Sequence, residues 1–231
     1  MNRADVRAGV RSSWAFVERL GIAQTVSAFE PLGVNEQFRD AALDVSKRYE
    51  EVYLVGLGQS HYSFILEDYG YFQFSCSVED EVRYAYFPNP FLSVESGADL
   101  SELREFVDEG IMSLEDYLHR VGEMRSGQYS TPVRYENSPS QYVSLSHPTS
   151  HFHFGHHAEN RWPLARILSP MAFTTLIAKQ FYGSAWTDRR HRDRVTGAND
   201  LERVLTNEKA ACEQLGHPHF SADERAQFFF D

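Results

Sequence analysis

Residues 61–87 read HYSFILEDYGYFQFSCSVEDEVRYAYF, and this stretch decides the fold. It contains three runs rich in β-branched and aromatic residues, namely His61–Leu66, Tyr71–Cys76 and Val82–Phe87. The runs are separated by Asp68-Tyr69-Gly70 and by Glu79-Asp80-Glu81. Because connections this short join antiparallel neighbours, the stretch predicts an antiparallel meander of three strands.

A helical pattern comes before this meander. Four apolar residues recur at helical spacing on one face: Val6, Val10, Trp14 and Val17. Residues 37–48 resume the pattern, so residues 1–48 are expected to form an N-terminal helical region. The apolar run Glu51–Leu57 is interpreted as a short strand.

More strands and a helix are predicted in the second half of the chain. The strands are Val133–Asn137, Tyr142–Ser146 and His151–Gly155. Residues 169–183 show the clearest helical pattern, with Ser169 as the N-cap and Pro170 as the first helical residue. The elements together predict a single α+β domain over residues 1–231, an antiparallel sheet covered by helices, with residues 130–183 as the core of a histidine motif.

The composition is that of a folded protein. The chain has 231 residues, of which 42% are hydrophobic, and a formal net charge of −11 at pH 7. It has no run of about 18 apolar residues and no signal-peptide pattern, and Cys76 and Cys212 fit no disulfide framework. We therefore expect a cytoplasmic protein that does not cross a membrane. The negative charge disfavours generic binding to DNA, although residues 161–209 carry nine basic and five acidic residues.

Five of the ten histidines fall within residues 147–157, HPTSHFHFGHH. On a strand, His151 and His153 point to one face, while Phe152 and Phe154 point to the other and anchor the strand in a core. Imidazole is the side chain best suited to bind a metal or to transfer protons near neutral pH. The run therefore predicts a functional site at His151 and His153.

Two chemistries are open to this pair of histidines. A divalent metal ion would need a third ligand, which His147 or Glu136 could supply. Without a metal, His151 and His153 could act as general acid and base in phosphodiester cleavage. Alternatively, the imidazoles decorate an exposed strand or satisfy buried polar groups and have no chemical role.

A second group of candidates surrounds the histidines. On a strand, Arg134 and Glu136 share one face, so Arg134 could hold a phosphate while Glu136 binds a metal or orients a histidine. The alternative is a cross-strand ion pair without function. Arg161 and Arg166 begin the basic stretch and are expected to contact substrate; the alternative is a solvated helix face that pairs with the chain's own acidic residues. Tyr182, at the end of the 169–183 helix, either lies in the core or projects its hydroxyl toward the sheet, where it is expected to contact substrate.

The order of these motifs resembles a known family. It runs Arg134-Tyr135-Glu136-Asn137, His147-Pro148, His151–Gly155, and then Ser169-Pro170 opening a helix that ends in Phe181-Tyr182. This order is similar to an uncharacterised bacterial family, domain-of-unknown-function family 2290, with its His-Pro-x-x-His-x-His-x-Gly core. The resemblance is specific over residues 130–183 and brings no established activity. A fainter similarity to TumE-type toxins, which are presumed to act on RNA, implies a toxin or phage-defence setting.

We therefore expect a phosphodiesterase-like enzyme, in particular a ribonuclease, whose substrate is RNA or a nucleotide. It is expected to act within a toxin–antitoxin or anti-phage defence system and to have a protein partner there, either an antitoxin or a subunit of a defence complex. The alternative is a non-catalytic subunit of a defence complex, whose acidic N-terminal half docks on a basic partner. A third possibility is a nucleotide-sensing module with an aromatic-walled pocket and no acid–base pair.

Overall fold

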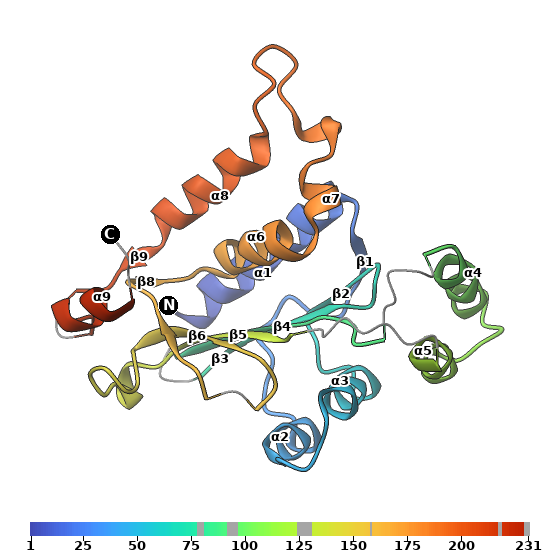
Figure 1. Cartoon of the computed structure of the whole chain (residues 1–231), viewed down its shortest axis with the longest axis horizontal. Helices are drawn as coiled ribbons and strands as arrows, with labels where there is room; N and C mark the ends of the chain where they lie inside the picture. Colours follow the sequence, from blue (N-terminus) through green and yellow to red (C-terminus); the bar gives the residue numbers. More distant parts are fainter. Residues whose placement is uncertain (78–80, 92–96, 124–130, 158, 217–218, 229–231) are drawn as a thin grey trace.

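The fold is built on a seven-stranded antiparallel sheet in which neighbours in sequence are also neighbours in space (Figure 1). The computed structural model describes the chain except for residues 78–80, 92–96, 124–130, 158, 217–218 and 229–231. The strands are β1 (Ala23–Val26), β2 (Phe64–Leu66), β3 (Tyr71–Cys76), β4 (Val82–Phe87), β5 (Val133–Asn137), β6 (Ser150–Phe154) and β7 (Trp162–Pro163). The predicted meander is confirmed as β2–β4, although Glu79 and Asp80 of its second turn lie outside the described residues.

The N-terminal region is helical, as expected, but it also contributes a strand. The first helix, α1 (Arg3–Leu20), starts with a capping box between Asn2 and Asp5 and ends at Gly21, which adopts the left-handed conformation. The strand β1 follows, and the second helix, α2 (Glu36–Leu43), comes only after it. The run of four residues in β1 is too short and too polar to be recognised as a strand by periodicity.

The expected strand at Glu51–Leu57 is wrong, because these residues lie in the helix α3 (Tyr49–Gly58). A short apolar run has no periodicity that separates a buried strand from a buried helix. The helix begins where the Glu51 carboxylate accepts the Arg48 backbone N–H at 2.9 Å. It needs Gly56, since a Cβ there would collide with the Tyr71 hydroxyl of the sheet.

The expected strand at Tyr142–Ser146 is also wrong. It is a tight turn in which the N–H of His147 donates to the carbonyl of Val143 at 2.7 Å, and Leu145 has a φ of 66°. A single-turn 3-10 helix, η1 (Pro139–Gln141), precedes it. The bend brings residues 142–149 back beside β6, and this places His147 near the predicted site.

One face of the sheet is mainly apolar and is covered by α1 and by α6 (Pro170–Phe181) (Figure 1). Phe173 of α6 contacts the rings of Phe72, Tyr84, Tyr135 and Phe152 from four successive strands. The predicted helix with Ser169 as N-cap is confirmed, and the Ser169 hydroxyl accepts the N–H of Ala172 at 3.0 Å. The core on this face holds the strands from β2 to β6 in register.

The remaining elements close the C-terminal half. They are β8 (Arg166–Ile167), α7 (Gly183–Trp186), the 3-10 helix η2 (Arg189–His191), α8 (Asp200–Ala211), β9 (Glu213–Gln214) and α9 (Ala222–Phe228). β8 and β9 pair with each other as a separate two-stranded sheet. Among the described residues, no helix is long and apolar enough to cross a membrane.

The opposite face of the sheet is divided. Its β2–β4 part forms a second core with α2, α3, α4 (Gly97–Asp108) and α5 (Leu114–Glu123), in which Tyr71, Ala85 and Phe87 are buried. Towards β5 and β6 the same face carries Arg134, Glu136, His151 and His153. The fold thus places a polar strip beside an apolar core on one rigid sheet.

Candidate functional site

The sheet register gathers four of the predicted site residues in one place. β5 and β6 are antiparallel, with Arg134 opposite His153 and Glu136 opposite His151. Residues directly opposite each other on antiparallel strands share a face, and their Cβ atoms lie about 4.5–5.5 Å apart. Four polar side chains therefore form a compact group on strands whose other face is held by Tyr135 and Phe152 in the core.

The centre of this group is a cluster of Glu136, His151 and His153. The Nε2 atoms of the two histidines are 3.0 Å apart, and one ligand atom from each of the three residues lies within 4.8 Å of the others. The two histidines are 0% and 6% exposed. The side chain of Glu136 is 12% exposed. A group of two imidazoles and a carboxylate at this spacing is a ligand set for a divalent metal ion.

The ring of His151 is oriented by the backbone. Its Nδ1 lies 2.7 Å from the carbonyl oxygen of Pro148. Since a carbonyl only accepts, Nδ1 of His151 carries a proton and donates it, so that Nε2 of the neutral ring presents its lone pair to the cluster. A carbonyl that fixes the tautomer in this way is the usual outer partner of a metal-binding histidine.

His153 is left with an unpaired atom. When both rings are neutral, Nε2–H of His153 donates to Nε2 of His151, and Nδ1 of His153 is buried without a partner among the described residues. Burial and the charge of Arg134 lower the pKa of His153 to about 4. Burial also lowers the pKa of His151. Both imidazoles are therefore uncharged at neutral pH, which is the form that binds metal ions.

Glu136 supplies the negative charge. Its carboxylate forms an ion pair with Arg83 at 3.0 Å, and Arg83 lies opposite it on β4. Burial raises the pKa of Glu136, but Arg83, His153 and Arg134 outweigh burial and hold this pKa below its ordinary value. An ionised carboxylate next to two neutral imidazoles matches what a divalent cation requires.

Cationic groups border the cluster. Burial lowers the pKa of Arg134, while the neighbouring Glu136 opposes that shift. Arg161 comes directly before Trp162, which is opposite Phe152, so continuing the register brings Arg161 level with His153. The Nε atom of Arg161 is buried with no partner among the described residues. Arginine donors at a neutral histidine pair favour an anionic ligand.

The other predicted site residues lie in different surroundings. The ring of His147 packs 5.0 Å from that of His151, and its Nδ1 is also buried and unpaired in the described part of the chain. Arg166 donates to the carbonyl oxygen of Cys212 at 2.7 Å. Tyr182 donates to the Asp68 carboxylate at 2.8 Å and contacts the hydroxyl of Tyr86 on the α6-covered face. The structure brings His147 to the cluster but not Arg166 or Tyr182.

The prediction that Phe152 and Phe154 both anchor the histidine strand in the core is right for Phe152 and wrong for Phe154. Phe152 packs on the core, but Phe154 is 40% exposed. Phe154 is the last residue of β6, where α6 no longer covers the sheet. Its ring contacts the ring of Trp162 on β7, 6.2 Å away.

The sequence analysis did not single out Arg83 or the Pro148 carbonyl. Alternation along β4 places Arg83 on the same face as Ala85, but only the pairing of β4 with β5 shows that it meets Glu136. The carbonyl of Pro148 is a backbone atom, so its role as a hydrogen-bond acceptor cannot be predicted from the residue type. The contact of Arg83 with Glu136 depends on the register of β4 and β5, and the contact of Pro148 with His151 depends on the bend before β6, so neither could be predicted from sequence.

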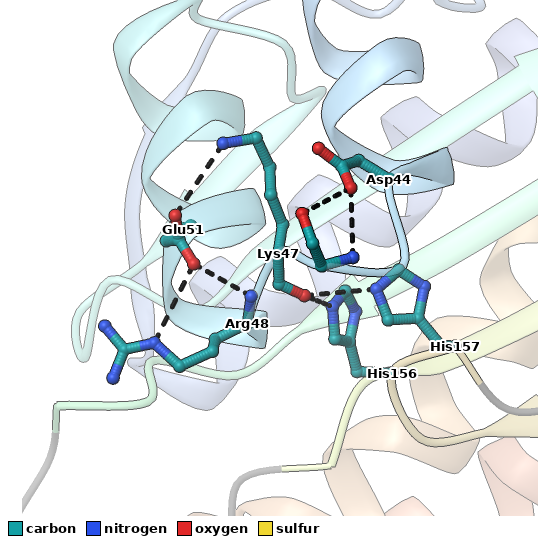
Figure 2. A network of polar contacts seen from close by, with 7 residues as sticks. Asp44, Lys47, Arg48, Glu51, His156 and His157 are labelled. Atoms are coloured by element: carbon teal, nitrogen blue, oxygen red, sulfur yellow. Dashed lines mark hydrogen bonds and ion pairs between the residues drawn. The ribbon is translucent and has the colours of Figure 1, made fainter.

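The loop after β6 is tied to the turn between α2 and α3. Figure 2 shows His156 and His157 both pointing at the backbone carbonyl of Lys47, to which their Nε2 atoms donate at 2.9 and 3.1 Å. The Lys47 ammonium in turn pairs with Glu51 at 3.7 Å. This contact joins the histidine strand to the helices that form the second core.

The comparisons with known proteins identify a family and nothing finer. A family model described as "Uncharacterized conserved protein (DUF2290)" matches residues 27–231. No curated protein and no solved structure matches the chain. The resemblance found over residues 130–183 is thus confirmed and extends over most of the chain, whereas the similarity to TumE-type toxins receives no support.

Proposed function

The chain belongs to the DUF2290 family of uncharacterised conserved proteins, and we propose that Glu136, His151 and His153 bind one divalent metal ion that serves phosphodiester hydrolysis. The metal would polarise a phosphoryl oxygen and lower the pKa of a bound water, as hydrolytic metal sites do. Arg134 and Arg161 would hold the phosphate group beside it. His147 would support the orientation of His151.

The observation that carries the proposal is the pre-set spacing of the ligand atoms. Two nitrogens 3.0 Å apart, each about 2.05 Å from a zinc ion, subtend an angle of about 94° at the metal. This angle lies between those of octahedral and tetrahedral coordination. The protonated Nδ1 of His151 further leaves Nε2 free to coordinate, so one of the two histidine ligands is already in the required tautomer.

The unpaired atoms point in the same direction. Three of the six buried side-chain polar atoms without a partner in the described structure belong to His147, His153 and Arg161, around this cluster. Buried polar groups without partners cost folding free energy, and functional sites are where proteins retain them. A bound water or phosphate would give such atoms partners, whereas the metal would be held by the Nε2 atoms of the two histidines.

The biological setting follows the expectation from sequence. We propose RNA or a nucleotide as the substrate, a cytoplasmic location, and a toxin–antitoxin or defence system with a protein partner as the context. The non-catalytic subunit remains the rival and predicts no hydrolysis.

Hydrolysis of bis(p-nitrophenyl) phosphate and of a short RNA, with and without added Mn²⁺ or Zn²⁺, tests the function. We expect metal-dependent turnover that is lost in Glu136→Gln and in His151→Ala. His119→Ala removes an exposed histidine from α5 and is the matched control. Turnover that persists in both cluster variants, or absence of turnover in the metal-loaded wild-type protein, would contradict the proposal.

A further inference from the structure

The β7 end of the sheet carries an exposed aromatic pair next to the cationic side of the cluster. Trp162 is 55% exposed and Phe154 is 40% exposed, and their rings meet edge to face. Trp162 keeps this exposure although α9 lies beside β7. Large aromatic side chains on a soluble surface that touch each other and remain exposed mark binding sites.

The pair is held rigidly. The side-chain amide of Asn160 accepts the Phe154 N–H at 2.8 Å and donates to the Phe154 carbonyl at 2.7 Å. Trp162 is opposite Phe152 in the β6–β7 register, and Phe152 is packed on the core. Both rings therefore stand on backbone that is fixed by hydrogen bonds before any ligand arrives.

The order of residues along β7 places a cation and a ring on the two sides of this edge. Arg161 directly precedes Trp162. Successive side chains of an extended strand point to opposite faces. Trp162 is opposite Phe152 and therefore on the α6-covered side, and continuing the same register brings Arg161 level with His153, on the side of the histidines. In the seven-stranded sheet β7 is the outermost strand, so the ring and the cation lie on the two faces of an edge strand.

We propose that the Trp162–Phe154 pair stacks a base of single-stranded RNA whose phosphate is held by Arg161 at the cluster. This proposal rests on the proposed function and names its substrate class. An aromatic platform beside a cationic groove is how proteins bind single strands, because every base has a flat π face and every nucleotide a phosphate. Bases in a duplex are already stacked and cannot lie on the platform.

Fluorescence anisotropy of a labelled short single-stranded RNA, with EDTA present to prevent cleavage, tests the platform. We expect Trp162→Ala to weaken binding about tenfold, within the range for loss of one stacked base, and Trp162→Phe to retain most of the affinity. The same RNA as a duplex should bind more weakly than the single strand. Phe181→Ala removes an equally exposed aromatic ring, 42% exposed at the end of α6, and should bind as the wild type does.

A second readout avoids dependence on the folding of the alanine variant. RNA should quench the tryptophan fluorescence of the wild-type protein, and Trp162→Phe should abolish most of that quenching. Unchanged RNA affinity in Trp162→Ala, or no quenching on saturation with RNA, would overturn the platform. Metal binding and the hydrolysis of bis(p-nitrophenyl) phosphate, which has no nucleobase, are measured separately on the wild-type protein. A failure of the metal site is therefore distinguishable from a failure of the aromatic platform.

Discussion

The Nδ1 atom of His151 donates a hydrogen bond to the carbonyl oxygen of Pro148 at 2.7 Å. This one contact sets the tautomer of a fully buried imidazole and directs its Nε2 atom at His153 and Glu136. Pro148 lies at the end of the turn that brings the chain back to β6, so a backbone bend determines the chemistry available on the strand. The proposed metal binding therefore depends on a specific hydrogen bond that keeps Nε2 of His151 unprotonated.

The lowered pKa values of the histidines predict how metal binding depends on pH. Imidazoles with ordinary pKa values lose bound metal as the pH falls through about 6.5. The pKa of His153 is about 4 because of burial and the charge of Arg134. We expect affinity to stay nearly constant as the pH falls through about 6.5 and to weaken only at lower pH. Equilibrium dialysis at several pH values measures it, and a midpoint near 6.5 would contradict the geometry.

The same shift predicts the pH dependence of stability for the metal-free protein. The folded pKa of His153 is below its unfolded value, so its contribution is fully present above pH 6.5 and is lost as the pH falls towards 4. The loss from this residue amounts to at most about 3 kcal/mol. Urea unfolding in EDTA between pH 7 and 4 measures it. His153→Gln should flatten the profile, and His119→Ala should not.

Arg161 is predicted to bind the anionic substrate. Arg161→Ala should raise KM for bis(p-nitrophenyl) phosphate by about 10- to 100-fold, because a charge-assisted hydrogen bond contributes about 1.5–3 kcal/mol. Arg161→Lys should recover only part of the loss, since a lysine lacks the planar fork. Arg189→Ala, an exposed arginine of η2, is the control. A KM equal to that of the wild type in Arg161→Ala would show that this side chain does not contact the substrate.

Glu224 of α9 is predicted to brace the turn that leads to Pro148. Its side chain is fully buried and accepts hydrogen bonds from the Ser221 N–H at 2.7 Å and from the Tyr142 hydroxyl at 3.3 Å. Glu224→Ala should cost about 1–3 kcal/mol, because buried donors lose their acceptor. That corresponds to a fall of roughly 2–12 °C in Tm for a chain of this size.

Asp223→Ala is the matched control for this prediction, since Asp223 is the exposed neighbour of Glu224. Thermal melting followed by circular dichroism compares the two variants. Equal melting temperatures for Glu224→Ala and Asp223→Ala would mean that α9 does not brace the turn.

Local sequence patterns were sufficient to predict much of this fold. The strands β3, β4 and β5 have the predicted ends, since alternation and short turns act within a few residues. Glu51–Leu57 could not be assigned correctly, because a short and nearly continuous apolar run shows neither the strand nor the helix period. The pairs β6–β7 and β8–β9 were missed because strands of two residues exist only through their partners. The single-domain organisation stays a prediction.

The central residues of the candidate site could be predicted from the sequence, but most of their partners could not. Alternation placed His151 and His153 on one face, and their closeness to Glu136 needed only the pairing of β5 with β6. The role of Arg83, the bond to Pro148 and the exposure of Phe154 depend on contacts between distant segments. Tyr182 was selected for its hydroxyl, but that hydroxyl lies on the α6-covered face, where it bonds to Asp68.

The most direct test of the central claim is an isothermal titration of the metal-free protein with Zn²⁺ and Mn²⁺ at pH 7. We predict one ion per chain in the wild type and in His119→Ala. In Glu136→Gln, His151→Ala and His153→Ala the affinity should fall by more than the 10–100-fold typical of losing an outer-sphere partner. No binding to the wild type, or equal affinity in all five proteins, would show that this cluster is not a metal site.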